Sequence, residues 1–187
     1  MTKKRMILVF GIILSFFLII NLIWFGAIGY PYYRYEKEMT RCDIEGSLIK
    51  YIYDDEHYIY EIKPPVDLGF SSGFLRVSQI RDTSYYVDKD IEGSRVYFLN
   101  EDGNRVYVDD YRQMEFYYWE KPFGNSEYGI MYWSKDLDAQ ILFDKEFRVI
   151  NGEASGYKEE FQRIIDKEKR QISEMMERAA DIWKLEY

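Results

Sequence analysis

A long apolar run near the N-terminus constrains this chain more than any other feature. From Met6 to Ile28 the sequence has no charged residue and consists mostly of Ile, Leu, Phe and Val. A helix rises about 1.5 Å per residue, so this run would extend roughly 35 Å. The hydrocarbon core of a bilayer is about 30 Å thick. We therefore predict a transmembrane helix, in preference to a buried helix of a soluble core.

The triplet Ala27–Gly29 leaves a second interpretation open, because its small-x-small pattern resembles a signal-peptidase site. On that interpretation the run is a secretory signal, cleaved after Gly29. The triplet lies more than twenty residues after Arg5, whereas the apolar region of a secretory signal is about 7–15 residues long. We favour an anchor that is retained.

The flanks of the run predict its orientation. Lys3, Lys4 and Arg5 precede it, and such charges stay on the cytoplasmic side of a membrane. Trp24, Tyr30, Tyr32 and Tyr33 follow, as is typical of the headgroup zone. We predict a single-pass cell-membrane protein with a cytoplasmic N-terminus. Its segments are a cytoplasmic stub (1–5), a transmembrane signal anchor (6–30), a juxtamembrane connector (31–46) and an extracytoplasmic α+β domain (47–187).

Composition narrows the classes of partner. The chain has 33 acidic and 25 basic residues, with a formal net charge of −8. All charges among the first 30 residues are basic, so the remainder is more acidic still. Nucleic-acid binding requires clustered Lys and Arg, and we expect none. Cys42 is the sole cysteine, which excludes an internal disulfide. A free thiol is our preferred interpretation of Cys42, over a disulfide to another chain.

Alternating apolar and polar residues predict strands from 47 to 150. The segments 47–53 and 57–63 have the pattern of a paired hairpin. The clearest turn signal is Asp102-Gly103, because both residue types accept the positive φ of a type I′ turn. A two-residue loop there pairs Leu99 with Val106, Phe98 with Tyr107 and Arg95 with Asp110.

The C-terminal segment, 156–186, predicts one long amphipathic helix. Nine apolar residues from Phe161 to Trp183 fall on one arc at 100° per residue. That arc is wider than a two-helix coiled-coil seam, which favours packing on the sheet. The predicted fold class is therefore α+β: a transmembrane helix, then a curved antiparallel β-sheet domain with a long C-terminal amphipathic helix packed on it.

Two features of this helix bear on function. Glu168 lies near the centre of the apolar arc, so a buried carboxylate is expected to find a tyrosine hydroxyl or an arginine from the sheet. A functional role for Glu168 is the alternative. We also expect the end of the helix to project past the sheet and to offer Trp183, Ile182 and Tyr187 to a partner.

The sequence assigns no catalytic, cofactor-binding or metal-binding residue, and we expect no cofactor. His57 is the only histidine, and a zinc site usually takes several His or Cys ligands. The acidic runs at residues 54–56 and 136–138 lack the spacing of an EF-hand and are interpreted as solvated turns. No GxxxxGK[ST] phosphate loop is present.

These observations favour a membrane-anchored, non-enzymatic interaction module, acting as a subunit or adaptor of a cell-envelope complex. Its expected partners are the membrane and another membrane or envelope protein; a homo-oligomer is possible but not indicated. The first alternative is a protein that binds an envelope polymer or a small ligand in an aromatic groove. An envelope hydrolase with two facing carboxylates is the second alternative.

Overall fold

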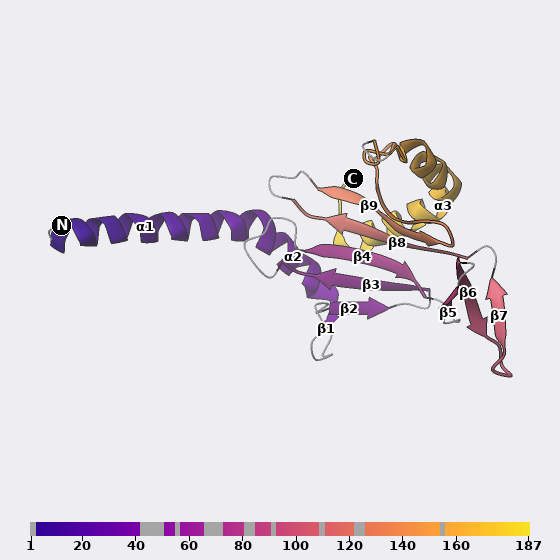
Figure 1. Ribbon diagram of the computed structural model, residues 1–187. Coiled ribbons are helices and arrows are strands. Elements are labelled where there is room, and N and C mark those ends of the chain that lie inside the picture. The colour runs from indigo at the N-terminus through magenta and orange to yellow at the C-terminus, as the bar shows by residue number, and fades with distance from the viewer. Residues whose placement is uncertain are drawn as a thin grey trace.

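The computed structural model describes residues 3–41, 51–54, 57–65, 73–80, 85–90, 93–108, 111–121, 126–153 and 156–187. Cys42 therefore lies outside the described residues. The architecture is α+β, as predicted: a long apolar N-terminal helix, antiparallel strands and a C-terminal helix. Figure 1 shows the N-terminal helix entering one end of the strand-rich body.

The N-terminal helix continues well past the predicted end of the anchor. Helix α1 (Lys3–Trp24) leads through a π-helical segment (Phe25–Gly29) into α2 (Tyr30–Tyr35), followed by a 3₁₀ turn (Glu36–Glu38). In the part of the chain that is described, this is the one helix long and apolar enough to cross a membrane. The first part of the expected connector is therefore helical.

Pro31 explains the local irregularity. Proline lacks the N–H that would bond four residues back, and its ring crowds the preceding turn. The π-helical segment ends just before Pro31, with the Tyr30 N–H bonded to the Phe25 carbonyl five residues earlier. A single wider turn thus lets the helix continue through the proline.

Most strands form one antiparallel sheet in the order β1-β2-β3-β4-β8-β9-β10. Its strands are β1 (Thr40–Arg41), β2 (Tyr51–Asp54), β3 (Tyr58–Lys63), β4 (Phe74–Gln79), β8 (Arg112–Trp119), β9 (Glu127–Ser134) and β10 (Asp138–Leu142). The predicted pairing of β2 with β3 is confirmed, with Asp54 opposite Ile59. The strong curvature that we expect of this sheet stays a prediction.

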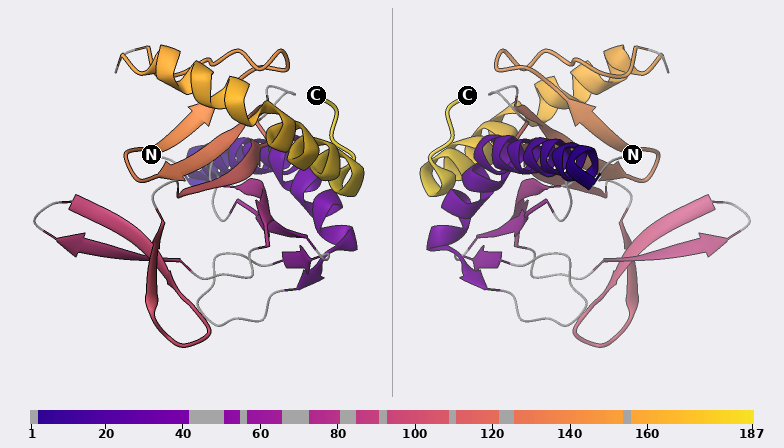
Figure 2. Two further views of the ribbon diagram at one scale, coloured as in Figure 1. Left: turned by 90° about the vertical axis from the view of Figure 1, so that its right-hand side faces the viewer. Right: turned by 90° about the vertical axis from the view of Figure 1, so that its left-hand side faces the viewer.

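Helix α3 (Lys158–Trp183) packs on one face of the seven-stranded sheet, as expected (Figure 2). Alternation along the strands provides the apolar face, because side chains two apart point to the same side. The fully buried sheet residues include Ile62, Leu75, Val77, Phe116, Ile130 and Ile141. From the helix, Ile165, Ile172 and Met175 meet them in one core cluster. The helix–sheet interface is therefore continuous and apolar, apart from Glu168.

A second sheet was not expected. Strands β5 (Tyr85–Asp90), β6 (Gly93–Leu99) and β7 (Arg105–Val108) form a separate three-stranded sheet. Our expectation of one sheet over 47–150 is wrong in this respect. Along β7 the residues Arg105 to Tyr107 are all exposed, so the period-two pattern that we interpreted as burial produces no helix-covered face here. Figure 1 places this sheet at the end of the body opposite α1.

The predicted hairpin register is wrong by one residue. Leu99 lies opposite Arg105, and Phe98 opposite Val106. The Gly103 N–H donates to the Asn100 carbonyl (2.9 Å), and Gly103 has φ +79°. This is a three-residue loop, in which a type I turn is followed by a glycine in the left-handed region. Glycine is needed for its positive φ, as predicted, but at the third loop position; Asp110 lies outside the described residues.

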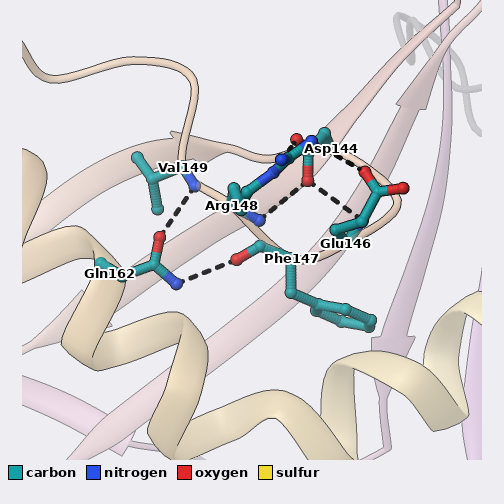
Figure 3. A network of polar contacts seen from close by, with 6 residues as sticks. All are labelled: Asp144, Glu146, Phe147, Arg148, Val149 and Gln162. Carbon is teal, nitrogen blue, oxygen red and sulfur yellow. Dashed lines mark hydrogen bonds and ion pairs between the residues drawn. The ribbon is translucent and has the colours of Figure 1, made fainter.

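At the end of the segment in which strands were expected, residues 147–150 form only one bridge, between Phe143 and Val149. The loop between them is held by side chains (Figure 3). Gln162 of α3 accepts a hydrogen bond from the Val149 N–H and donates to the Phe147 carbonyl, both at 2.9 Å. Asp144 caps the turn, accepting from the Arg148 backbone and guanidinium. A single glutamine thus replaces the strand pairing that was expected.

Candidate functional site

The end of α3 does not project past the sheet, so the expected exposure of Trp183 is wrong. Trp183 is 3 % exposed and packs edge-on against Tyr60 of β3, with ring centroids 6.1 Å apart. Ile182 is partly buried against the same core. A side chain already filling the core cannot also contact a partner. The apolar arc therefore belongs to the domain interior along its whole length.

The C-terminal residues turn back instead of extending outward. Lys184 has φ +56°, which ends the helix and reverses the chain. Leu185 is then buried, and the Tyr187 ring lies edge-on to those of Phe116, Tyr118 and Tyr128. The Tyr187 hydroxyl donates to the Met176 carbonyl at 3.2 Å. The ring of Tyr187 is thus a packing element, although its outer edge reaches solvent.

Glu168 is 8 % exposed, and its partner comes from the sheet. Arg112, the first residue of β8, donates from Nη1 to Glu168 Oε1 at 3.0 Å. The two charges come from chain positions 56 residues apart. A buried carboxylate without a partner is costly, so the Arg112–Glu168 pair explains how a charge is tolerated on the apolar face of α3.

A small polar recess surrounds this ion pair. Its volume is about 200 Å³, and its walls come from β4, β8, β9 and α3. The lining residues are Gln79, Arg112, Gln113, Met114, Tyr132, Glu168 and Gln171. Gln171 donates to the Gln79 carboxamide (3.0 Å), which links the helix to the sheet edge. The recess is neither a tyrosine-lined groove nor a pair of facing carboxylates.

A second polar cluster lies on the opposite face of the seven-stranded sheet. Glu61, Arg76 and Tyr117 are neighbours across β3, β4 and β8. Arg76 forms an ion pair with Glu61, and its Nη1 donates to Glu115 Oε2 at 3.2 Å. Both carboxylates are largely buried, at 8 % exposure each. One arginine therefore balances two acidic side chains within the sheet.

Tyr117 completes this cluster. Burial is the main cause that raises the pKa of Tyr117, so its phenol stays protonated. The hydroxyl donates to Glu115 Oε2 at 3.0 Å. Its ring stacks on Trp119 (5.5 Å between centroids) and lies edge-on to Phe74 (5.1 Å). A row of partly buried aromatic rings thus continues the cluster toward the end of the sheet where α1 enters.

The arrangement of Glu61 and Glu115 does not resemble the carboxylate pair of a glycoside hydrolase. Such a pair faces across the scissile bond and leaves room for a sugar and a water. Here Arg76, on the strand between them, contacts both carboxylates. The guanidinium occupies the space that a substrate would need, so this cluster favours a structural ion network over acid–base chemistry.

The N-terminal helix itself is built into the core. Ile28 and Tyr32 are each 1 % exposed and belong to the central apolar cluster. Tyr32 packs against Gly73, where an added Cβ would lie 2.7 Å from the tyrosine ring. Gly73 therefore makes room for Tyr32. The expected placing of Tyr32 at the headgroup level is wrong, because its side chain points into the domain.

Hydrogen bonds reinforce this junction. Tyr35 of α2 donates to Glu120 Oε2 at 2.7 Å, and the Tyr118 hydroxyl lies 3.1 Å from the same oxygen. Burial raises the pKa of Tyr118 to about 12, so it remains a neutral donor near physiological pH. Glu120 immediately follows β8. Helix α2 is thus held by the apolar packing of Tyr32 and, at its C-terminal end, by the hydrogen bond from Tyr35 to the Glu120 carboxylate.

The sequence predicted a buried carboxylate at Glu168. It did not predict the roles of Arg76 and Arg112, or the packing of the end of the N-terminal helix against the sheet domain. The sequence did contain a signal for this packing, because Ile28, Tyr32 and Tyr35 recur at helical spacing.

The only histidine, His57, is exposed. Among the described residues, no group of three or more His, Cys, Asp or Glu side chains comes together as metal ligands would.

Comparison with protein-family models, with curated proteins and with solved structures finds no match for this chain in any of the three.

Proposed function

We propose that this protein is a membrane-anchored extracytoplasmic interaction module, a subunit or adaptor without enzymatic activity of its own. The N-terminal residues 1–5 lie in the cytoplasm, α1 spans the membrane, and the sheet domain stands on the outer face.

The observation that carries this proposal is the burial of Ile28 and Tyr32 in the domain core. Cleavage after Gly29 would remove Ile28 from that core and leave a cavity, which destabilises a folded domain. α1, in contrast, has no buried residue, as a lipid-facing helix would require. A helix that is exposed and apolar first, and then built into a soluble core, fits a retained anchor better than a cleaved signal.

The faces of α2 fit a position at the membrane surface. Tyr32 points into the domain, whereas Tyr30 and Tyr33 are 50 % and 64 % exposed. Tyrosine is enriched at the headgroup level, where its ring is apolar and its hydroxyl is wet. In Figure 1 the strands near α2 run broadly along the direction of α1, so the three-stranded sheet lies at the end of the domain farthest from the anchor.

We assign the partner contact to the β6–β7 hairpin. Leu99 and Tyr107 are 47 % and 42 % exposed and share one face of the hairpin, because Leu99 lies opposite Arg105, two residues before Tyr107. Grouped exposed apolar side chains mark interaction surfaces in soluble domains. The Arg105 guanidinium lies over the Tyr97 ring at 4.8 Å, and aromatic–arginine surfaces are enriched at protein interfaces. The expected partner is an envelope or membrane protein with a complementary apolar surface.

Retention of the anchor is tested by mass spectrometry of the membrane-extracted chain. We expect a protein that still contains residues 6–28. A mature chain beginning at Tyr30 would contradict the anchor and would make the protein secreted.

The partner contact is tested by site-specific photo-crosslinking in intact membranes. A photo-reactive phenylalanine analogue replaces Tyr107, and in a matched control it replaces Tyr157, a tyrosine of similar exposure (47 %) before α3. We expect a discrete adduct from position 107 that is absent from position 157. The adduct should disappear in the Leu99→Asp background, because Leu99 shares the face of Tyr107. Equal adducts from both positions would contradict the assignment of the hairpin.

A further inference from the structure

The recess beside the Arg112–Glu168 pair has features that packing alone does not require. A buried ion pair can often be replaced by apolar residues of similar volume without loss of stability. Here the pair lies at the edge of a helix–sheet interface that is otherwise apolar. Two carboxamides from separate elements then gather around it: Gln79 ends β4 and Gln171 lies in α3. The Gln113 side chain lies between those of Arg112 and Met114 along β8, so it points to the opposite face of the sheet.

We propose that this recess binds one neutral, hydroxyl-rich unit, such as a single sugar residue or a polyol. Its volume of about 200 Å³ would hold roughly six or seven waters at about 30 Å³ each. That is the size of one sugar ring, and it is smaller than the usual pocket of a drug-sized ligand. The site goes beyond the interaction role proposed above and does not depend on it.

Charge selects a neutral ligand. The carboxylate of Glu168 is already balanced by the Arg112 guanidinium at 3.0 Å. A charged ligand would unbalance this pair in a partly buried site, which costs more than binding a neutral one. The remaining side chains that face the recess are two neutral amides, a methionine and a tyrosine.

Hydrogen-bond chemistry selects hydroxyl groups. Each carboxamide carries two N–H donors and an acceptor oxygen. One Gln171 N–H bonds to the Gln79 oxygen (3.0 Å). The Gln79 amide keeps its N–H donors, and Gln171 keeps its acceptor oxygen. Hydroxyl groups both donate and accept, so they suit this mixed lining, while Tyr132 and Met114 supply apolar contact for the C–H face of a ring.

The experiment uses the full chain in phosphatidylcholine nanodiscs, because sugar-based detergents would compete. Saturation-transfer NMR measures binding of N-acetylglucosamine, glucose, myo-inositol and glycerol, with glucuronate and glucosamine as charged comparators. We expect saturable binding of at least one neutral compound, in the millimolar range or tighter, and weaker binding of both charged comparators.

Matched variants locate the site. Gln171→Ala lies on a helix, where alanine is favourable, so the fold should persist. It should weaken binding by about three- to tenfold, the loss that one or two hydrogen bonds represent. Gln79→Ala should act similarly, whereas Gln140→Ala, an exposed glutamine of β10 outside the recess, should leave binding unchanged.

Three results would overturn the proposal: no saturable signal from any neutral compound, affinity unchanged by both Gln79→Ala and Gln171→Ala, or a charged comparator that binds more tightly. None of these results bears on anchor retention or on the hairpin, since neither involves the recess. Failure of this site and failure of the proposed function are therefore distinguishable.

Discussion

The two sheets of this protein share a strand pattern but differ in what covers them. In the seven-stranded sheet, the alternating apolar residues of β3, β4, β8 and β9 are buried under α3 and α2. In the three-stranded sheet, the described residues of β7 are largely exposed and no helix packs on them. Alternation of apolar and polar residues therefore predicts strands in both sheets. Burial of their apolar residues depends in addition on helices from distant parts of the chain that pack on the sheet. The larger sheet should carry the stability of the domain and the smaller one should be dispensable for folding.

The largest expected difference is between Phe116→Ala and Val106→Ala. Phe116 is fully buried, so its truncation should cost about 3–5 kcal/mol. Val106 is 38 % exposed, so the same truncation should stay within about 0.5 kcal/mol. Thermal unfolding of the full chain in nanodiscs, followed by near-UV circular dichroism, measures both. Similar losses would mean that the two sheets share one core after all.

The helix junction gives the next largest effect. Ile28→Ala should cost about 2–5 kcal/mol, because Ile28 is buried in the same core as the larger sheet. Ile23→Ala, only five positions earlier and 52 % exposed, is the matched control and should leave the melting temperature of the domain nearly unchanged. If Ile28→Ala were as mild as Ile23→Ala, Ile28 would not contribute to the core of the domain.

The stability of the β6–β7 turn should depend on the backbone conformation at Gly103 and not on contacts of the side chain introduced there. At Gly103 there is open space for a Cβ, but φ is +79°. Gly103→Val should cost about 1–3 kcal/mol, because a β-branched residue resists positive φ. Gly103→Asn should cost much less, since asparagine tolerates this region. Amide hydrogen exchange along β6 and β7, which reports local opening of the hairpin, measures the difference. A Val variant whose amides are as protected as those of the Asn variant would contradict the observed turn.

The smallest effect is electrostatic and concerns the loop that follows β10. Desolvation slightly opposes the charge of Asp144, but hydrogen bonds from the Arg148 backbone and guanidinium outweigh it and lower the pKa of Asp144. A carboxylate with a lowered folded-state pKa stabilises the protein above its unfolded pKa, near 4, and this stability is lost as pH falls through the folded pKa. Asp144→Asn should therefore melt slightly below the native protein at pH 7, with the difference closing toward pH 3. A difference that stays constant with pH would contradict the role of the charge.

Local patterns were sufficient for the elements that depend on few distant contacts. The apolar run predicted the long N-terminal helix, and the nine-residue arc predicted α3 on the sheet. The β2–β3 pairing followed from a turn flanked by two alternating segments. Each of these predictions rests on a period that persists over many residues, so an error at one position does not change the outcome.

The predictions that proved wrong concern features whose structure depends on a single residue or on a single distant contact. Asp102-Gly103 is compatible with a two-residue and with a three-residue loop, and the Asn100–Gly103 hydrogen bond selects the longer one. Trp183 on an apolar arc can fill a core or face a partner, and only the position of Tyr60 decides between them. Nothing in the sequence around Arg112 indicated that its guanidinium lies 3.0 Å from Glu168, because this contact depends on the packing of α3 against β8.

The helix is continuous from Lys3 to Tyr35, which has a mechanical consequence if α1 spans a membrane as proposed. A transmembrane helix tilts to fit its apolar length to the bilayer, on average by about 20°. Because this helix has no break before it joins the core, the domain would tilt with it in the bilayer. A strand of eight residues such as β8 is about 26 Å long, so a 20° tilt moves its far end sideways by roughly 9 Å. Bilayer thickness would then set where the distal hairpin meets its partner.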